Sequence, residues 1–172
     1  ATKNKLASNS IIVGTLGHNK LIDKLVAKNK LDVRALENRW ESYLIEVVRN
    51  PFPGVNKALV IVGSDRRGTA YGLFSISETI GVSPWYWWAD APVAKHTELN
   101  LKVDKIISKE PTVKYRGIFI NDEDWGLLRW AKNTFEKERG NIGPKTYAKV
   151  CELLLRLKAN YLCPAMHEAS TA

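Results

Sequence analysis

Long hydrophobic runs and cysteine are scarce in this sequence. None of its 172 residues belongs to an apolar run of about 18, the length that a membrane-spanning helix requires, so we predict no membrane span. The first ten residues, ATKNKLASNS, also lack the apolar core of a signal peptide. The two cysteines, Cys151 and Cys163, can form one disulfide at most and lack a metal-ligand spacing. We therefore expect two buried or half-buried thiols and no metal or other cofactor.

The chain is basic, but it has no basic block. It carries 26 Lys and Arg against 18 Asp and Glu, a formal charge of +8, yet no five like charges follow one another. A pI near 9.5 is typical of nucleic-acid-binding proteins. The even spread of charge instead indicates a solvated surface, so we predict no nucleic-acid partner. The balance of 45% hydrophobic and 26% charged residues is that of a folded globular chain.

Residues 1–110 have the pattern of a small α/β domain with a mixed sheet. Short apolar stretches predict strands over residues 11–15, 43–49 and 58–62, and a returning strand over 97–103. The stretch 58–62 is apolar throughout, which predicts burial on both faces. Apolar residues at helical spacing predict helices over 18–29 and from about 69 to 80.

Residues 111–172 have the pattern of one βαβ unit. Pro111 marks a linker, and a buried strand is expected over 115–120. A helix should begin near Pro144 and carry an apolar stripe of Tyr147, Val150, Leu154 and Leu157, followed by a strand over 161–163. Such a unit implies parallel strands, and it cannot cover its own faces. We therefore expect exposed apolar faces that favour self-association.

Polar side chains follow both of these predicted strands. Asn121, Asp122, Glu123 and Asp124 come directly after the first, and His167 and Glu168 follow the second. Ligands of parallel α/β folds bind at the carboxyl ends of strands, so these residues are candidates for acid/base work or ligand contacts. The alternatives are a solvated loop whose Asp124 caps a helix beginning at Trp125, and a purely structural His167.

Two further motifs could bind a ligand. The four aromatics of residues 85–88, WYWW, could stack on sugars or bases, with Trp85 and Trp87 on one side if the stretch is extended. They could equally lie between two domains. Residues 65–68, DRRG, could hold an anion at a helix N-terminus, although we favour an ion pair between Asp65 and one neighbouring arginine.

Several longer segments resemble glycoside hydrolase family 115, the xylan α-glucuronidases. They are RGIFINDEDWG (116–126), GPKTY (143–147), LLLRLKANYLCPAMH (153–167), GSDRRGTAYG (63–72) and IGVSPWYWWAD (80–90). The likeness runs in matched order from about Ile11 onward, which is far more specific than a single short motif.

This resemblance implies an α+β amino-terminal domain over residues 1–110. Residues 111–172 would be the first βαβ unit of a (β/α)₈ TIM barrel, incomplete because a whole barrel takes roughly 200–250 residues. The family removes glucuronic or 4-O-methylglucuronic acid side chains from glucuronoxylan by inverting hydrolysis, and it works mostly outside the cytoplasm.

For the site, the resemblance implies that Asp122 is catalytic and that Asn121, Glu123 and His167 bind the substrate. The partner would be a glucuronoxylan-type polysaccharide or oligosaccharide, and the localisation secreted or periplasmic. We expect the 172-residue chain alone to be inactive. The alternative is a non-catalytic carbohydrate-binding module that uses Trp85–Trp88.

Overall fold

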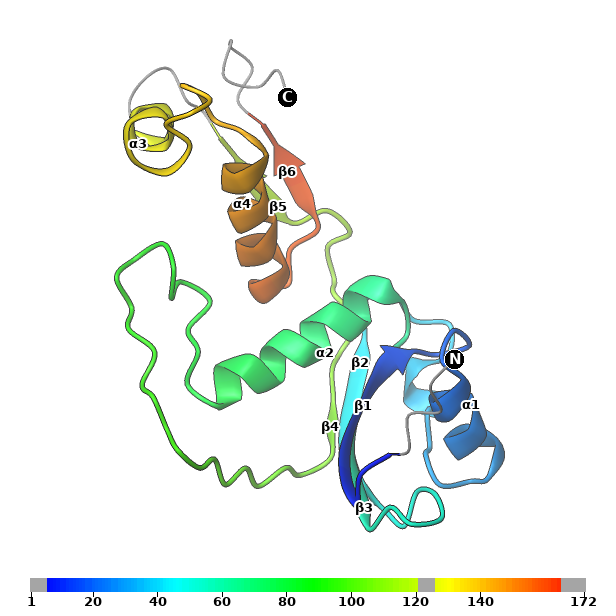
Figure 1. Ribbon diagram of the computed structural model, residues 1–172. Coiled ribbons are helices and arrows are strands. Elements are labelled where there is room, and N and C mark those ends of the chain that lie inside the picture. Colours follow the sequence, from blue (N-terminus) through cyan, green and yellow to red (C-terminus); the bar gives the residue numbers. More distant parts are fainter. Residues whose placement is uncertain (1–5, 121–125, 165–172) are drawn as a thin grey trace. The chain divides into compact units, whose positions relative to one another are not determined.

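The computed structural model describes residues 6–120 and 126–164 (Figure 1). It divides the chain into two compact units, residues 1–112 and 113–172. Within the described residues, no helix has both the length and the apolar character needed to cross a membrane. Each unit is considered by itself below.

The first unit is built on a mixed four-stranded sheet, as the sequence predicts. Its strand order is β1 (Asn9–Thr15), β3 (Lys57–Gly63), β2 (Tyr43–Arg49) and β4 (Ile106–Ile107). β1 runs parallel to β3, whereas β2 is antiparallel to both β3 and β4. β2 has the predicted bounds, and β1 and β3 extend the predicted strands by one or two residues.

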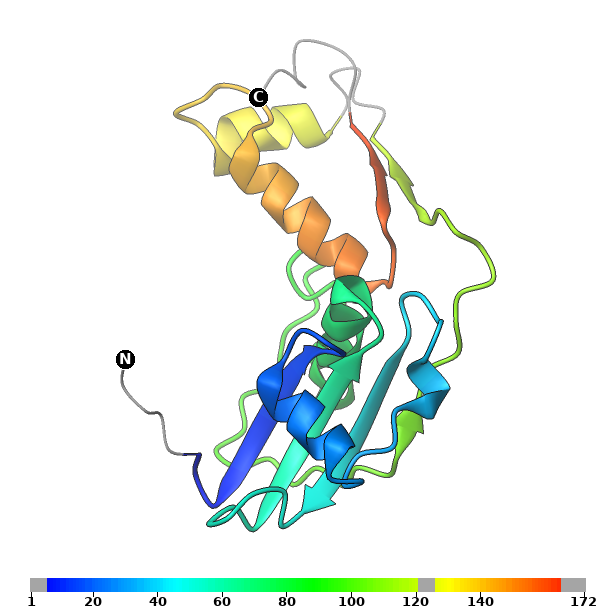
Figure 2. The same ribbon diagram turned by 90° about the vertical axis from the view of Figure 1, so that its right-hand side faces the viewer.

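Two helices cover opposite faces of this sheet. α1 (Lys20–Ala27) buries Ile22 and Leu25 in a core cluster that includes Val60 and Val62 of β3. Figure 2 shows α1 lying over that face. α2 (Arg66–Thr79) approaches the other face, where its Gly72 lies against the Ile61 side chain. β3 is thus buried from both sides, which confirms the prediction from its continuous apolar run. A 3₁₀ turn (Arg34–Leu36) adds Leu36 to the α1 side of the core.

The predicted strand over residues 97–103 is wrong. That stretch has no regular secondary structure, and most of its side chains are exposed. The edge of β2 pairs instead with Ile106 and Ile107. Ser108 holds this register, because its hydroxyl oxygen accepts a hydrogen bond from the Tyr43 N–H (2.8 Å) and its N–H donates to the Tyr43 carbonyl (2.9 Å).

Asp65 caps α2. The expected ion pair between Asp65 and a neighbouring arginine is therefore wrong. Its carboxylate accepts hydrogen bonds from the N–H groups of Gly68 (2.7 Å) and Glu41 (2.8 Å). Arg67 pairs with the buried carboxylate of Glu41 at 2.5 Å. The helix begins at Arg66, three residues earlier than predicted. The Asp65 carboxylate already accepts a hydrogen bond from a backbone N–H at the N-terminus of the helix, where a bound anion would otherwise do so.

The second unit is a βαβ unit, as predicted. β5 (Gly117–Phe119) and β6 (Tyr161–Cys163) are parallel, and α4 (Pro144–Arg156) connects them after α3 (Leu127–Trp130) and a π-helical turn (Ala131–Phe135). α4 begins at Pro144 as predicted and buries Val150, Leu153 and Leu154.

Three expectations for this unit need correction. The strand predicted as buried is half exposed, with Phe119 at 55%, because two short strands leave one of their faces without a covering element. Leu157, predicted to lie in the apolar stripe of α4, is 40% exposed because it lies just beyond the last residue of that helix. Both cysteines are free thiols; Cys163 is half-buried as expected, whereas Cys151 is exposed on the solvent side of α4.

We expect Asp65→Ala to lower the free energy of unfolding of the first unit by about 1–2 kcal/mol, because the substitution removes the cap of α2. Denaturant unfolding with a probe in this unit measures the change. The matched control is Asp104→Ala, which removes an exposed carboxylate and should cost no more than about 0.5 kcal/mol. Equal losses in the two variants would contradict the capping role.

Candidate functional site

The candidate site is the edge at which β5 and β6 end. The two strands pair in parallel with Phe119 opposite Cys163, and the Ile120 N–H donates to the Cys163 carbonyl at 2.9 Å. β5 therefore ends beside β6 at the same edge. Residues 121–125 follow β5 in the sequence and residues 165–172 follow β6, so both predicted site segments come directly after this pair of strand ends.

The predicted site residues themselves lie outside the described residues. These are Asn121, Asp122, Glu123 and His167, together with the alternative cap Asp124. The structure describes the two strands that precede them, β5 and β6. Both segments start from neighbouring parallel strands, which is the arrangement that places ligand-binding residues in parallel α/β folds.

The opposite ends of the two strands are fastened by Arg116 and Asn160. The Asn160 carboxamide oxygen accepts from the Arg116 N–H (3.0 Å), and the Asn160 N–H donates back to the Arg116 carbonyl (2.8 Å). The Arg116 guanidinium donates to the Lys158 carbonyl, at 2.9 Å from Nη2. These bonds set the register of β5 against β6. Sequence reasoning missed both residues as positioning groups, although Arg116 opens the strongest family-like segment.

Gly117 is required for the close approach of the two strands. A Cβ atom built at this position would lie 1.8 Å from the Tyr161 carbonyl oxygen. Any side chain here would force β5 away from β6 and displace the edge at which the site segments begin. The glycine in the sequence RGIF therefore has a local steric reason.

Glu136 caps α4 from outside that helix. Its carboxylate is buried and accepts from the backbone N–H groups of Gly143 (2.9 Å), Lys145 (3.2 Å) and Thr146 (2.8 Å). The Thr146 hydroxyl donates a fourth bond at 2.6 Å. Helix starts leave unpaired N–H groups of this kind, and Glu136 satisfies them. It thereby ties the segment after β5 to the beginning of the crossover helix.

These hydrogen bonds also decide the charge state of Glu136. Burial opposes ionisation, but the bonds from Thr146, Lys145 and Gly143 outweigh it, and the pKa of Glu136 lies below its ordinary value. A carboxylate that is ionised and fully engaged is a poor proton donor. We therefore assign Glu136 a structural role in holding the frame of the site.

One sequence signal could have found Glu136. The residue at the N-cap of α4 is Gly143, which has no side chain to cap the helix, and Pro144 follows it. A capping group must then come from elsewhere in the chain. A Cβ at Gly143 would lie 2.5 Å from Glu136 Oε1, so the glycine leaves room for the distant carboxylate.

The aromatic motif of residues 85–88 forms turns, so the extended alternation considered for it is wrong. The N–H groups of Trp88 and Ala89 both donate to the Trp85 carbonyl, at 2.9 and 3.0 Å. Trp87 and Trp88 meet edge to face with ring centroids 4.9 Å apart, and Trp85 is 46% exposed. The motif thus presents one exposed indole and two half-buried indoles that pack against each other.

No group of three or more His, Cys, Asp and Glu side chains within residues 6–120 and 126–164 is placed to hold a metal ion.

Comparison with known proteins connects both units to one enzyme family. Residues 108–172 match the family model described as glycosyl hydrolase family 115. Among solved structures, 11 chains match. One of them is a family GH115 4-O-methyl-α-glucuronidase with specificity for decorated arabinogalactans; it is 44% identical over 94% of this chain, with a TM-score of 0.78. The present chain spans 20% of that protein's chain. No curated protein matches.

We expect Gly117→Ala to destabilise the second unit by about 2–3 kcal/mol, because its Cβ overlaps the Tyr161 carbonyl. Denaturant unfolding of this unit measures the loss. Gly126→Ala is the control, since a Cβ there meets nothing within 4 Å. If both variants unfold alike, the close pairing of β5 and β6 is not what stabilises the unit.

We expect Glu136→Gln to destabilise the second unit by about 2 kcal/mol near neutral pH, because a charged acceptor of four hydrogen bonds is lost. Hydrogen exchange at the amides of residues 143–146 should become faster. Glu138→Gln, which removes only an exposed partner of Lys145, is the control and should leave exchange at residues 143–146 unchanged.

The difference between wild type and Glu136→Gln depends on pH in a defined direction. The folded-state pKa of Glu136 is lowered, so its stabilisation is fully present above the ordinary carboxyl pKa of about 4.3. It is lost as the pH falls through the lowered folded-state value. Unfolding of both proteins, measured from neutral to acidic pH, should therefore converge in acid; a constant difference would contradict the capping role of the ionised carboxylate.

Proposed function

The chain belongs to glycosyl hydrolase family 115, and from that premise we propose that the protein containing it is an α-glucuronidase. The observation that carries this proposal is the 44% identity to a 4-O-methyl-α-glucuronidase over 94% of the chain. Identity at that level extends across both units, so it does not depend on one short motif. The proposed reaction is hydrolysis of the bond between a 4-O-methylglucuronic acid side chain and its polysaccharide.

The polysaccharide is a finer part of the proposal. The family resemblance of the sequence motifs favours glucuronoxylan, whereas the similar solved enzyme is described as specific for decorated arabinogalactans. Both polymers would present the same acidic side chain on different backbones. We propose glucuronoxylan-type chains as substrates, with arabinogalactan as the comparison that tests the backbone. Substrates of this size favour action outside the cytoplasm.

We propose that residues 111–172 form the first βαβ unit of a (β/α)₈ barrel and residues 1–110 an amino-terminal domain. The parallel pair of β5 and β6 supports this, because barrel enzymes place their catalytic residues after the carboxyl ends of strands. Asp122 is then the proposed catalytic carboxyl group, and Asn121, Glu123 and His167 the proposed sugar-binding residues.

An inverting mechanism needs a carboxylic acid to protonate the leaving oxygen and a carboxylate to activate water on the opposite face of the sugar. The two groups lie roughly 6.5–9.5 Å apart in such enzymes, which leaves room for the water. In our proposal Asp122 is one of this pair. Hydrogen bonds between the sugar hydroxyls and Asn121, Glu123 and His167 would orient the ring, with an ionised Glu123 as acceptor, so that the bond to be broken faces the acid.

Purified protein from the complete gene should release 4-O-methylglucuronic acid from glucuronoxylan, and Asp122→Asn should slow release by about 10²–10⁴-fold, as expected when general acid–base catalysis is lost. Asp104→Asn is the matched control and should retain full activity. The anomeric configuration of the first product, followed by NMR, tests inversion. The 172-residue chain assayed in parallel should release nothing.

Three results would contradict parts of this proposal. Release from arabinogalactan alone would contradict the proposal that the substrate has a xylan backbone. A retained anomeric configuration would contradict the inverting mechanism. Glycan binding by the complete protein without any release, lost in Trp88→Ala but kept in Asp122→Asn, would favour the carbohydrate-binding module instead.

A further inference from the structure

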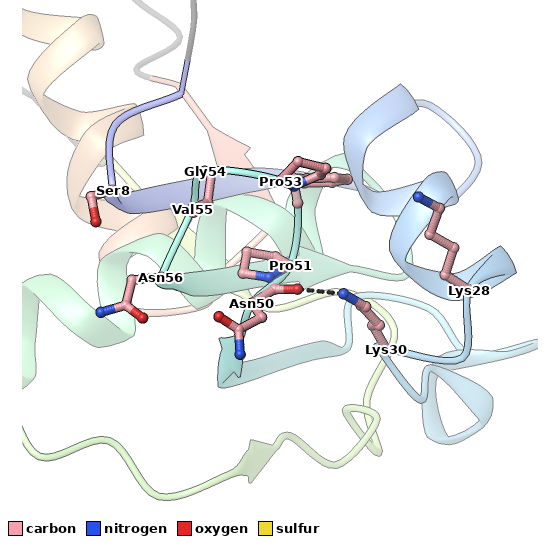
Figure 3. A pocket seen from close by; sticks show the side chains of 10 residues that line it. Ser8, Lys28, Lys30, Asn50, Pro51, Pro53, Gly54, Val55 and Asn56 are labelled. Atoms are coloured by element: carbon pink, nitrogen blue, oxygen red, sulfur yellow. Dashed lines mark hydrogen bonds between the residues drawn. The ribbon is translucent and has the colours of Figure 1, made fainter.

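An open surface pocket of about 610 Å³, called the cavity below, lies in the first unit, outside every site discussed above (Figure 3). It is formed where three segments meet: the residues before β1, the residues after α1, and the turn between β2 and β3. The side chains that matter for its chemistry are Ser8, Lys28, Lys30, Asn50, Phe52 and Asn56. Its volume is within the range of small-ligand sites.

The cavity is positively charged. Lys28 and Lys30 line it, and no Asp or Glu does. Neither lysine takes part in an ion pair with a carboxylate of the described residues. The Lys30 ammonium donates to the Asn50 carbonyl, as Figure 3 shows, and this contact holds it at the turn. An ammonium has three donors, so two remain for a ligand.

The wall of the cavity is held in place before any ligand arrives. The Asn50 N–H donates to the Asn56 carbonyl (2.8 Å), and the Asn56 N–H donates to the Ser8 carbonyl (2.7 Å). Pro51 and Val55 are buried beneath the turn. Phe52 packs against the core cluster that also contains α1. Ordering the turn therefore costs a ligand little binding energy.

We propose that this cavity binds the carboxylate-bearing ring of a uronic acid. Lys28 and Lys30 supply the charge that a carboxylate needs, in charge-assisted hydrogen bonds. The carboxamide of Asn50, the residue that Lys30 contacts, supplies a donor and an acceptor suited to hydroxyls of the same ring. Ser8 and Asn56 lie at the other end of the cavity, where they could bind hydroxyls of an adjoining sugar (Figure 3). The exposed Pro53 ring offers an apolar surface for the C–H face of a sugar.

The choice of a uronic acid over another anion rests on the proposed function, in which the polysaccharide carries glucuronic acid side chains. The cavity would then hold a second acidic side chain of the same polymer. Its lining lacks the arginines that bind phosphate in a bidentate manner, and no helix begins in it. The residues that line it all belong to the first unit, whereas the proposed catalytic residues belong to the second.

The test titrates the 172-residue chain with sodium glucuronate and, separately, with glucose, which has the same ring but a neutral CH₂OH group. NMR shifts of the backbone amides report binding. We expect shifts at the amides of Lys30, Asn50, Phe52 and residues 54–56 with glucuronate, and none there with glucose; Pro51 and Pro53 have no amide N–H. Lys28→Gln and Lys30→Gln should each weaken glucuronate binding about fivefold, and the control Lys20→Gln, on the first turn of α1, less than about twofold.

Three outcomes would overturn the assignment. Equal shifts with glucose would show that the carboxylate is not recognised. Inorganic phosphate binding as tightly as glucuronate would show a general anion site. If the amides of Asn50, Phe52 and residues 54–56 did not shift, or if Lys20→Gln weakened binding equally, the cavity would not be the binding site.

Failure of this inference can be told apart from failure of the proposed function. The titration needs no catalysis, and the release assay uses the complete protein with Asp122 intact. Release of 4-O-methylglucuronic acid without glucuronate shifts would leave the proposed function standing and overturn the cavity assignment. If the 172-residue chain showed glucuronate shifts with the predicted lysine dependence but the complete protein released nothing, the cavity assignment would stand and the proposed function would be overturned.

Discussion

The parallel pairing of β5 and β6 is the constraint on which the candidate site depends. Parallel strands cannot be joined by a tight turn, so a crossover helix must lie between them. α4 is that helix, and its first turn is stabilised by the distant carboxylate of Glu136. Arg116 and Asn160 hold the other end of the pair in register. Together these contacts determine where the chain leaves the sheet to form the segments that contain Asp122 and His167.

A capping carboxylate stabilises a helix start in each unit. Asp65 caps α2 and also binds the Glu41 N–H, and Glu136 caps α4 from a position seven residues before its N-cap. In each case an acidic side chain completes backbone donors that a helix start leaves open. Acidic residues inside family-like segments are therefore not all candidates for catalysis. Acidic residues whose carboxylate oxygens already accept hydrogen bonds from backbone N–H groups have a structural role.

Acidic sugar chemistry links the two proposals. A polysaccharide bearing 4-O-methylglucuronic acid carries repeated negative charges along its length, and this chain has a formal charge of +8. Long-range attraction between opposite charges would raise the local concentration of the proposed substrate. Two of the positive charges of the chain, those of Lys28 and Lys30, line the cavity together with amide and hydroxyl side chains.

The sequence by itself determined the elements whose signals are local. β2 and β6 have the predicted bounds, and α4 begins at Pro144, because apolar runs, helical spacing and proline act within a few residues. The family was also evident from the order of its long segments. Tertiary structure alone decided that the edge of β2 pairs with residues 106–107 and not 97–103, since contacts to β2 from the flanking Lys105 and Ser108 hold residues 106–107 at that edge. It likewise decided that Asp65 and Glu136 cap helices, and that residues from three segments form the lysine-lined cavity. Such partners are separated in the chain, so no local sequence pattern predicts their contacts. They meet only after the sheet and helices have packed.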